Sequence, residues 1–406
     1  MRIFGLRNAY SVVLSAGGPR QLPEGEAGRR LFGPVASGVQ ATDVLLRNGG
    51  RLHLEAASRP EYGTPECGSV PDLVVQDKAG ERILEGLLED AGQRVREEGD
   101  AGGMSVLKAS ADPAGRPYGC QEEYLLGRGG GFGRLADILI PFLITRQLIC
   151  GAGAVARTPH GTVYCLSRAA GPAGNGLSPL ALRSRPFIST RDEPRVIRGE
   201  PRAAKSRRLL VAVSESNMSE TTTLLKAGAT DLVLRMAEAG TVVLPGLVLD
   251  KVVRVIGEVS SDITGRSRVG LAGGRQLSAL DIQREYLARA KDFADSHGAD
   301  AVSGRVLALW ERVLDAIGAG NLDAIAREID WVIKYQLIER YRAEHDVPLS
   351  APGVAQADLA YHDIRRGHGL YYQAQRSGAV ERTTRDIDIF EAKTVPPAPL
   401  RYRQAG

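Results

Sequence analysis

Apolar and polar residues alternate in short segments along the first half of the chain, and this period of two residues is typical of β-strands. Gly, Pro or Asn residues separate most of these segments and mark turns. The predicted strands are Arg2–Leu6, Tyr10–Leu14, Val44–Arg47, Arg51–Glu55, Met104–Lys108, Glu122–Leu126, Thr162–Ser167 and Leu209–Val213. We therefore expect a sheet that is built mainly from the first half of the chain.

Apolar residues at helical spacing dominate the second half and predict amphipathic helices there. One earlier segment, Asp77–Glu98, also has an apolar stripe opposite a charged one, as in a helix that covers a sheet. The helices predicted in the second half are Ser278–His297, Gly304–Ala319 and Leu322–Ala343, the last two separated by a turn at Gly320-Asn321. Strands followed by helices predict the α+β class.

The chain is long enough for one large domain or two closely packed ones, and we expect a single domain over residues 1–393, β-rich up to residue 215 and helical from residue 216. A proline-rich tail follows at residues 394–406, where the prolines prevent a packed element. Two segments rich in small, proline or charged residues, Arg168–Ser178 and Ile197–Arg208, are predicted to be surface loops.

Composition narrows the class of protein. A chain of 406 residues with 43% hydrophobic composition can bury a core without disulfides, and its four cysteines lack zinc-ligand spacing. The net charge of +4 is spread along the chain, which argues against a nucleic-acid surface. The apolar run Ile138–Ile144 is too short to span a membrane, and Met1–Leu6 is too short for a secretory signal. We expect a soluble, cytoplasmic protein that binds neither nucleic acid nor membrane.

The segment from Arg51 to Glu55 carries the most informative polar pattern. Because side chains alternate across a strand, Arg51, His53 and Glu55 share one face of it. On the concave side of a sheet, that face would hold a triphosphate with its metal ion, and Glu61 would add a second carboxylate. The alternative is a polar strand that faces solvent.

Two further segments contain candidate phosphate ligands. Ser184–Pro194 holds two arginines, Arg185 and Arg191, which suit phosphate binding or structural ion pairs equally well. The glycine-rich segment Gly127–Gly133 lacks the Lys-Ser/Thr of a P-loop and is predicted to be a flexible turn.

Long strings spread along the chain resemble the Pup ligases of the proteasome accessory factor A type, relatives of the depupylase and of glutamine synthetase. The strings that carry the resemblance are Leu46–Gly49, Arg51-Leu52, Pro60–Tyr62, Asp77–Glu81, Tyr118–Cys120, Leu135–Gly153, Ser184–Pro194, Ser216–Met236, Ala279–Tyr286, Glu328–Tyr341 and Asp358–Arg365. The resemblance implies a glutamine-synthetase-like carboxylate–amine ligase fold, in which a curved, largely antiparallel sheet forms a cradle packed against helices.

Pup ligases use ATP and Mg²⁺ to phosphorylate the C-terminal glutamate of the small protein Pup, and a substrate lysine then attacks to form an isopeptide bond. By position, the resemblance implies that Arg51 and Thr64 contact ATP and that Glu61 is a metal ligand. His53 stands where the family has a metal-binding tyrosine, and Glu55 where it has the general-base aspartate. We also expect Arg191, from the segment Ser184–Pro194, to contact the phosphates of ATP.

Several positions depart from the family pattern. The opening glycine-x-glutamate-x-glutamate becomes Gly5-Leu6-Arg7-Asn8-Ala9, so that a cation replaces a magnesium ligand. Two family histidines become Gln121 and Leu210. The chain is also expected to lack the family's small C-terminal domain, with its closing tryptophan.

These departures leave three hypotheses. The chain is a Pup ligase with weak or altered activity, or a pseudoenzyme that binds Pup, a nucleotide or a ligase-like partner subunit without turnover, or a ligase for a small carboxylate in a biosynthetic pathway. A depupylase-like hydrolase is less well supported, because it would need the same missing metal ligands.

Overall fold

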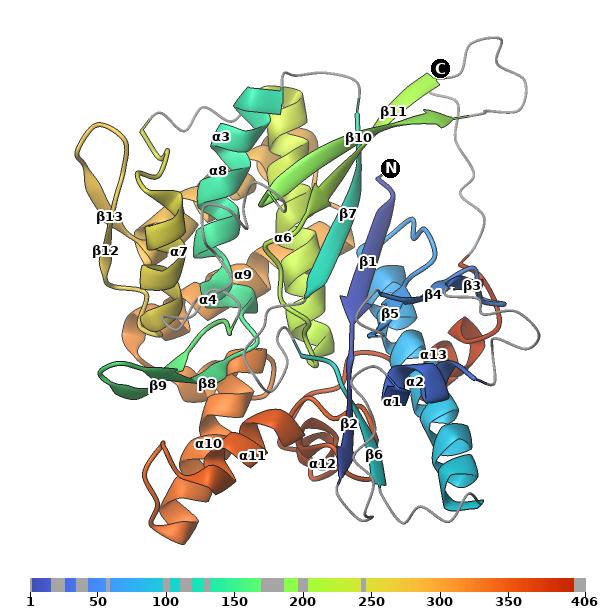
Figure 1. Cartoon of the computed structure of the whole chain (residues 1–406). Helices are drawn as coiled ribbons and strands as arrows, with labels where there is room; N and C mark the ends of the chain where they lie inside the picture. The colour runs from blue at the N-terminus through green and yellow to red at the C-terminus, as the bar shows by residue number, and fades with distance from the viewer. Residues whose placement is uncertain are drawn as a thin grey trace.

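The computed structural model describes residues 2–15, 26–33, 43–55, 59–97, 103–109, 119–127, 132–168, 186–195, 204–241 and 246–397. Within these ranges the chain has the predicted α+β architecture, with a twisted sheet beside a group of long helices (Figure 1). The predicted turn at Gly127–Gly133, the predicted loops and the proline-rich tail lie largely outside the described residues.

A seven-stranded sheet runs through the molecule in the order β10-β11-β7-β1-β5-β4-β3, and every neighbouring pair in it is antiparallel. Its strands are β1 (Phe4–Ala9), β3 (Asp43–Leu45), β4 (Arg51–Leu54), β5 (Pro60–Gly63), β7 (Cys120–Leu126), β10 (Ile188–Arg195) and β11 (Ala204–Val211). Three two-stranded ribbons accompany it: β2 (Ser11–Ser15) with β6 (Gly103–Leu107), β8 (Ala154–Thr158) with β9 (Gly161–Cys165), and β12 (Arg268–Gly270) with β13 (Gln276–Ser278).

Helices pack against one face of this sheet and against one another. They are α1 (Glu26–Phe32), α2 (Val70–Glu97), α3 (Phe132–Thr145), α4 (Gln147–Cys150), α6 (Glu220–Ala239), α7 (Val252–Ser261), α8 (Ala279–His297), α9 (Ala301–Ala319), α10 (Asp330–His345), α11 (Pro352–Ala360), α12 (Leu370–Arg376) and α13 (Asp386–Ala392), with a 3-10 turn η1 (Leu322–Ile325). None of the helices in the described ranges is long and apolar enough to cross a membrane.

Local sequence signals explain several helix ends. The Ser219 side chain caps α6, and Ser278 with Asp281 forms a reciprocal capping box at α8. Helix α9 begins after the capping residue Asp300 and ends at Gly320, whose φ of 69° is the left-handed conformation that glycine adopts most easily.

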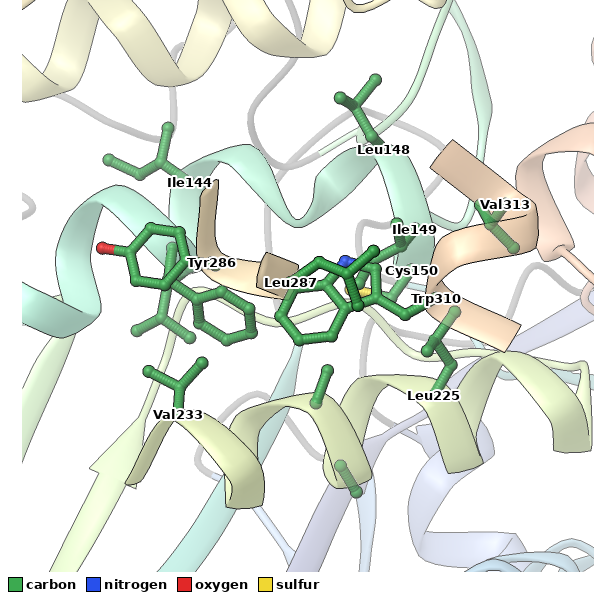
Figure 2. Packing of buried hydrophobic residues seen from close by; sticks show 14 of the residues in the cluster. Ile144, Leu148, Ile149, Cys150, Leu225, Val233, Tyr286, Leu287, Trp310 and Val313 are labelled. Atoms are coloured by element: carbon green, nitrogen blue, oxygen red, sulfur yellow. The ribbon is translucent and has the colours of Figure 1, made fainter. Parts of the chain in front are cut away.

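The main hydrophobic core lies between the sheet and the long helices. Figure 2 shows side chains from α3, α4, α6, α8 and α9 meeting around Trp310, which is fully buried. The Trp310 indole donates a hydrogen bond to Gln283 at 3.1 Å, and its ring lies edge-on to Phe142. A second core is centred on Tyr62 and lies between α1, α2 and strands β4 to β6.

Buried charges tie the covered face of the sheet to the helices. The Arg146 guanidinium donates two hydrogen bonds, of 2.5 and 3.0 Å, to the Glu122 carboxylate, and both side chains are about 1% exposed. Burial alone would raise the pKa of Glu122, but the Arg146 charge holds this pKa below its ordinary value. On β1, the Asn8 amide donates to Asp77 on α2 at 2.7 Å, and Lys108 binds the other oxygen of Asp77 at 2.6 Å.

Most of the predicted elements are present, with boundaries shifted by a few residues. The predicted loop Ile197–Arg208 is wrong at its end, because residues 204–208 belong to β11. The predicted helix Leu322–Ala343 is interrupted, since the chain forms η1 and then restarts as α10. Strand β5 was not predicted, although it lies between β1 and β4 and carries Glu61.

The contact between β5 and α2 requires a glycine. A Cβ on Gly80 would lie 2.2 Å from the Tyr62 ring, and that ring is held by hydrogen bonds of its hydroxyl to Asn48 and Gln76. Gly80→Ala should therefore lower the free energy of unfolding by about 1–3 kcal/mol, measured by urea titration. In the same helix Gly86 has nothing within 4 Å of an added Cβ, so Gly86→Ala should raise it by about 0.5–1 kcal/mol. Equal effects at the two positions would contradict this account of the contact.

A buried imidazole predicts a pH dependence of stability. Burial, and then the Lys334 ammonium with its Nζ 2.6 Å from His362 Nε2, lower the pKa of His362 well below its ordinary value. In the unfolded chain the His362 imidazole takes up a proton as the pH falls below about 6.5, whereas in the folded chain it stays neutral. The free energy of unfolding should therefore fall as pH decreases from 7 to 5. His362→Gln should reduce this slope in urea titrations at several pH values. His345→Gln, on the exposed end of α10, is the matched control, and an unchanged slope in His362→Gln would refute the assignment.

Candidate functional site

The open face of the sheet collects polar side chains because directly opposite residues in an antiparallel sheet project to the same side. Arg51 on β4 lies opposite Gly63 on β5, which lies opposite Arg7 on β1, and Arg7 in turn lies opposite Gln121 on β7. Gly63 has no side chain, so the two arginines face each other across an open position. One row of the sheet thus presents two guanidinium groups on the same face.

Neighbouring rows add further charged groups to this face. Asp43, His53 and Glu61 lie opposite one another on β3, β4 and β5. At the other end of the sheet, Arg191 on β10 lies opposite Arg208 on β11. The covered face carries the intervening residues, such as the fully buried Leu52 and Tyr62.

These side chains line a cavity of about 630 Å³, which we call the sheet cavity. Its lining residues are Gly5, Leu6, Arg7, Asp43, Leu45, Gly49, Arg51, His53, Glu61, Gly63, Thr64, Pro65, Glu66, Gln121, Glu123, Arg191, Arg208 and Leu210. Four arginines and four carboxylates stand among them. Arginine forks suit phosphate oxygens, so the cavity can bind a phosphate-bearing ligand.

Five of the six predicted site residues meet in the sheet cavity: Arg51, His53, Glu61, Thr64 and Arg191. Arg51 is 64% exposed, and its Nε lies 3.2 Å from Asp43. Arg191 is also exposed, His53 is half-buried, and the Glu61 side chain is only 12% exposed.

Thr64 is fixed at the base of the cavity by the backbone of β1. Its hydroxyl accepts a hydrogen bond from the Leu6 amide at 3.1 Å, and its own amide donates to the Leu6 carbonyl at 2.9 Å. The hydroxyl keeps a hydrogen that can be donated to a ligand. The position therefore suits a contact with a phosphate or ribose oxygen.

The sixth predicted residue, Glu55, lies just beyond the end of β4 and does not line the sheet cavity. Its carboxylate pairs with Arg59 at 3.1 Å, and its amide donates to the Arg59 carbonyl at 3.0 Å. Glu55 is thus not among the residues that line the cavity, and its role as a base stays a prediction.

A row of ion pairs crosses the floor of the cavity. Arg7 lies between two carboxylates, with Nε 3.4 Å from Glu61 and Nη2 3.1 Å from Glu123. Arg208 continues the row, with Nη1 3.0 Å from Glu123 and Nη2 2.7 Å from Glu66. Negative and positive groups therefore alternate across β5, β1, β7 and β11.

The side chains of the cavity that could act as metal ligands do not fit a magnesium ion. Mg²⁺ is held by carboxylate oxygens, but Glu61 and Glu123 are already paired with the permanently charged Arg7. Among the residues that the structure describes, no three His, Cys, Asp or Glu side chains are grouped so that they could hold a metal ion. The predicted ligands His53 and Glu61 are neighbours across β4 and β5 and make at most a partial site.

Sequence patterns alone missed Glu123 and Arg208 as site residues. Glu123 lies in the predicted strand Glu122–Leu126. The alternation of side chains along this strand does not tell which of its two faces lines a cavity and which packs against helices. Arg208 was assigned to a loop, whereas it lies in β11. Gln121 and Leu210, noted only as departures from the family pattern, both line the cavity.

Comparison with known proteins identifies the family. The sequence model of the Pup-ligase proteins matches residues 18–404. A Pup--protein ligase of Kribbella flavida is 55% identical over 407 aligned residues, which cover 100% of this chain and 88% of that protein. The chain belongs to the Pup-ligase family.

Solved structures of Pup ligases have the same fold. The ligase PafA in complex with the prokaryotic ubiquitin-like protein Pup superposes with a TM-score of 0.90 at 36% identity, covering 98% of this chain and 79% of that one. PafA in complex with ADP gives a TM-score of 0.82 at 36% identity, covering 94% and 82% of the two chains. The fold that the resemblance implied is therefore confirmed.

Proposed function

We propose that this Pup-ligase family member binds an adenine nucleotide in the sheet cavity and uses it to join the C-terminal glutamate of Pup to a lysine, with slower turnover than its relatives. The observation that carries the proposal is the meeting of five predicted ligand residues, from strands far apart in sequence, in one cavity of about 630 Å³. A PafA structure with ADP and another with Pup have the same fold, which supports the choice of both ligands.

The charges of the cavity suggest how the nucleotide lies. Arg51 and Arg191 line the cavity on β4 and β10, near opposite edges of the sheet, where they would contact phosphate oxygens from two sides. Thr64 would donate its hydroxyl hydrogen from the base. His53 and Glu61 lie on the β4–β5 side and would face the terminal phosphate or the substrate carboxylate.

The reaction of the family has two steps. The glutamate carboxylate of Pup attacks the terminal phosphorus of ATP, and ADP leaves. The lysine amine then attacks the resulting acyl phosphate, so that an isopeptide bond forms and inorganic phosphate leaves. We propose Glu55 as the group that accepts the amine proton, which requires its carboxylate to exchange Arg59 for the substrate.

The reason to expect slow turnover is the guanidinium of Arg7. Phosphoryl transfer depends on cations that neutralise the developing charge on the phosphate oxygens, and a +1 guanidinium supplies less charge than a +2 metal ion. The same ion pairs favour a second candidate function, in which the chain binds Pup, a nucleotide or a ligase subunit without turnover.

The first test is calorimetric titration of the full chain with ADP and with ATP, each in EDTA and in excess Mg²⁺. Binding in either buffer satisfies the proposal. Arg51→Gln should weaken binding about tenfold, as expected when one charge-assisted phosphate contact is lost. Arg254→Gln, an exposed arginine on α7 outside the cavity, is the matched control and should leave affinity unchanged. Absence of binding in both buffers would contradict the proposed function.

The second test is product analysis by mass spectrometry after incubation with ATP, Pup ending in glutamate and a lysine-bearing acceptor. Release of ADP with an isopeptide conjugate is the expected result. Nucleotide binding without products would favour the second candidate. ADP release with glutamate or another small carboxylate, but not with Pup, would indicate the biosynthetic ligase instead.

A further inference from the structure

The feature that bears on the ionic form of the ligand is the position of Arg7 between two carboxylates. Glu61 and Glu123 belong to strands on either side of β1, and their side chains are only 12% and 14% exposed. Carboxylates with so little access to water need a cation close by. Arg7 supplies it to both, through Nε on one side and Nη2 on the other.

Arg208 makes the pairing of Glu123 complete. The two oxygens of Glu123 are divided between two arginines, with Oε1 facing Arg7 and Oε2 facing Arg208. A divalent ion that approached these oxygens would have to displace a guanidinium that cannot lose its charge. The carboxylates are thus satisfied by the chain's own cations.

Arg7 can also reach a ligand while it holds these two partners. Its side chain is 43% exposed, and Arg7 is one of the residues that line the sheet cavity. A guanidinium has five N–H donors in a rigid fork, which allows it to contact carboxylates and a phosphate together. In this respect it does what a divalent ion does when it bridges carboxylates and phosphates.

We propose that Arg7 stands in for a divalent cation between Glu61 and Glu123, so that the sheet cavity binds a phosphate-bearing ligand in its metal-free form. The inference rests on the proposed function for the identity of the ligand, a nucleoside diphosphate or triphosphate. It adds the ionic form in which that ligand is recognised.

The charge balance of the cavity supports this choice. The four arginines and four carboxylates of its lining cancel without any added ion. A nucleotide that arrives with Mg²⁺ brings a second cation next to Arg7, and the two repel each other. A metal-free nucleotide brings only phosphate oxygens into the cavity that Arg7, Arg51 and Arg191 line.

The deciding experiment compares the affinity of the unmodified chain for ADP in EDTA and in excess Mg²⁺, by calorimetry at one ionic strength. The expected result is binding in EDTA that is at least as tight as in Mg²⁺. Binding that requires Mg²⁺ would overturn the inference and leave the proposed nucleotide binding intact. No binding of ADP in either buffer would instead remove the proposed function, and the inference with it.

A variant tests the same point through the metal itself. Arg7→Gln leaves Glu61 and Glu123 without their shared cation, so Mn²⁺ followed by electron paramagnetic resonance should bind at least about tenfold more tightly than to the unmodified chain. The variant should also bind ADP more tightly with Mg²⁺ than in EDTA. Arg51→Gln is the matched control, because it removes a cavity arginine that does not bridge these carboxylates, and should create no Mn²⁺ site. Equal Mn²⁺ affinity in Arg7→Gln and the unmodified chain would contradict the stand-in role.

Discussion

The alternation of side chains across β1 is the constraint on which both the fold and the site depend. Asn8 faces the helices and binds Asp77 and Ser216, while its neighbour Arg7 faces the cavity. A slip of one residue in the register would send the guanidinium into the core and the amide to the open face. The buried partners of Asn8 therefore determine where Arg7 lies, although they never touch the ligand site.

Buried ion pairs reinforce this register on the strand beside β1. Glu122 faces inward to Arg146, and the next residue, Glu123, faces outward to Arg7 and Arg208. Two adjacent glutamates on β7 thus serve different purposes. The inner one anchors the strand to the helices, and the outer one sets the charge of the cavity. The residues that hold the scaffold together and those that set the charge of the cavity therefore lie on opposite faces of the same strand.

Sequence patterns predicted the α+β class and the placement of Arg51 and His53 on one face, because both follow from local periodicity. They did not predict β5, whose sequence Pro-Glu-Tyr-Gly has weak strand propensity and is held in place by pairing with β1 and β4. They also could not predict that Arg7 pairs with Glu123, a contact between residues 116 positions apart. Five of the six predicted site residues line the cavity, but the ion pairs among its residues depend on three-dimensional register.

The order of strands in the sheet has a consequence for biosynthesis. A chain leaving the ribosome has made β1, β4 and β5 by residue 63, yet the cavity wall that contains Arg208 is added only with β11, which ends at Val211. Until then, the strand that carries Glu123 has no neighbour on that side. A ligand of this cavity can therefore act only once residue 211 of the 406 has been made, and it cannot guide the steps of folding that come before.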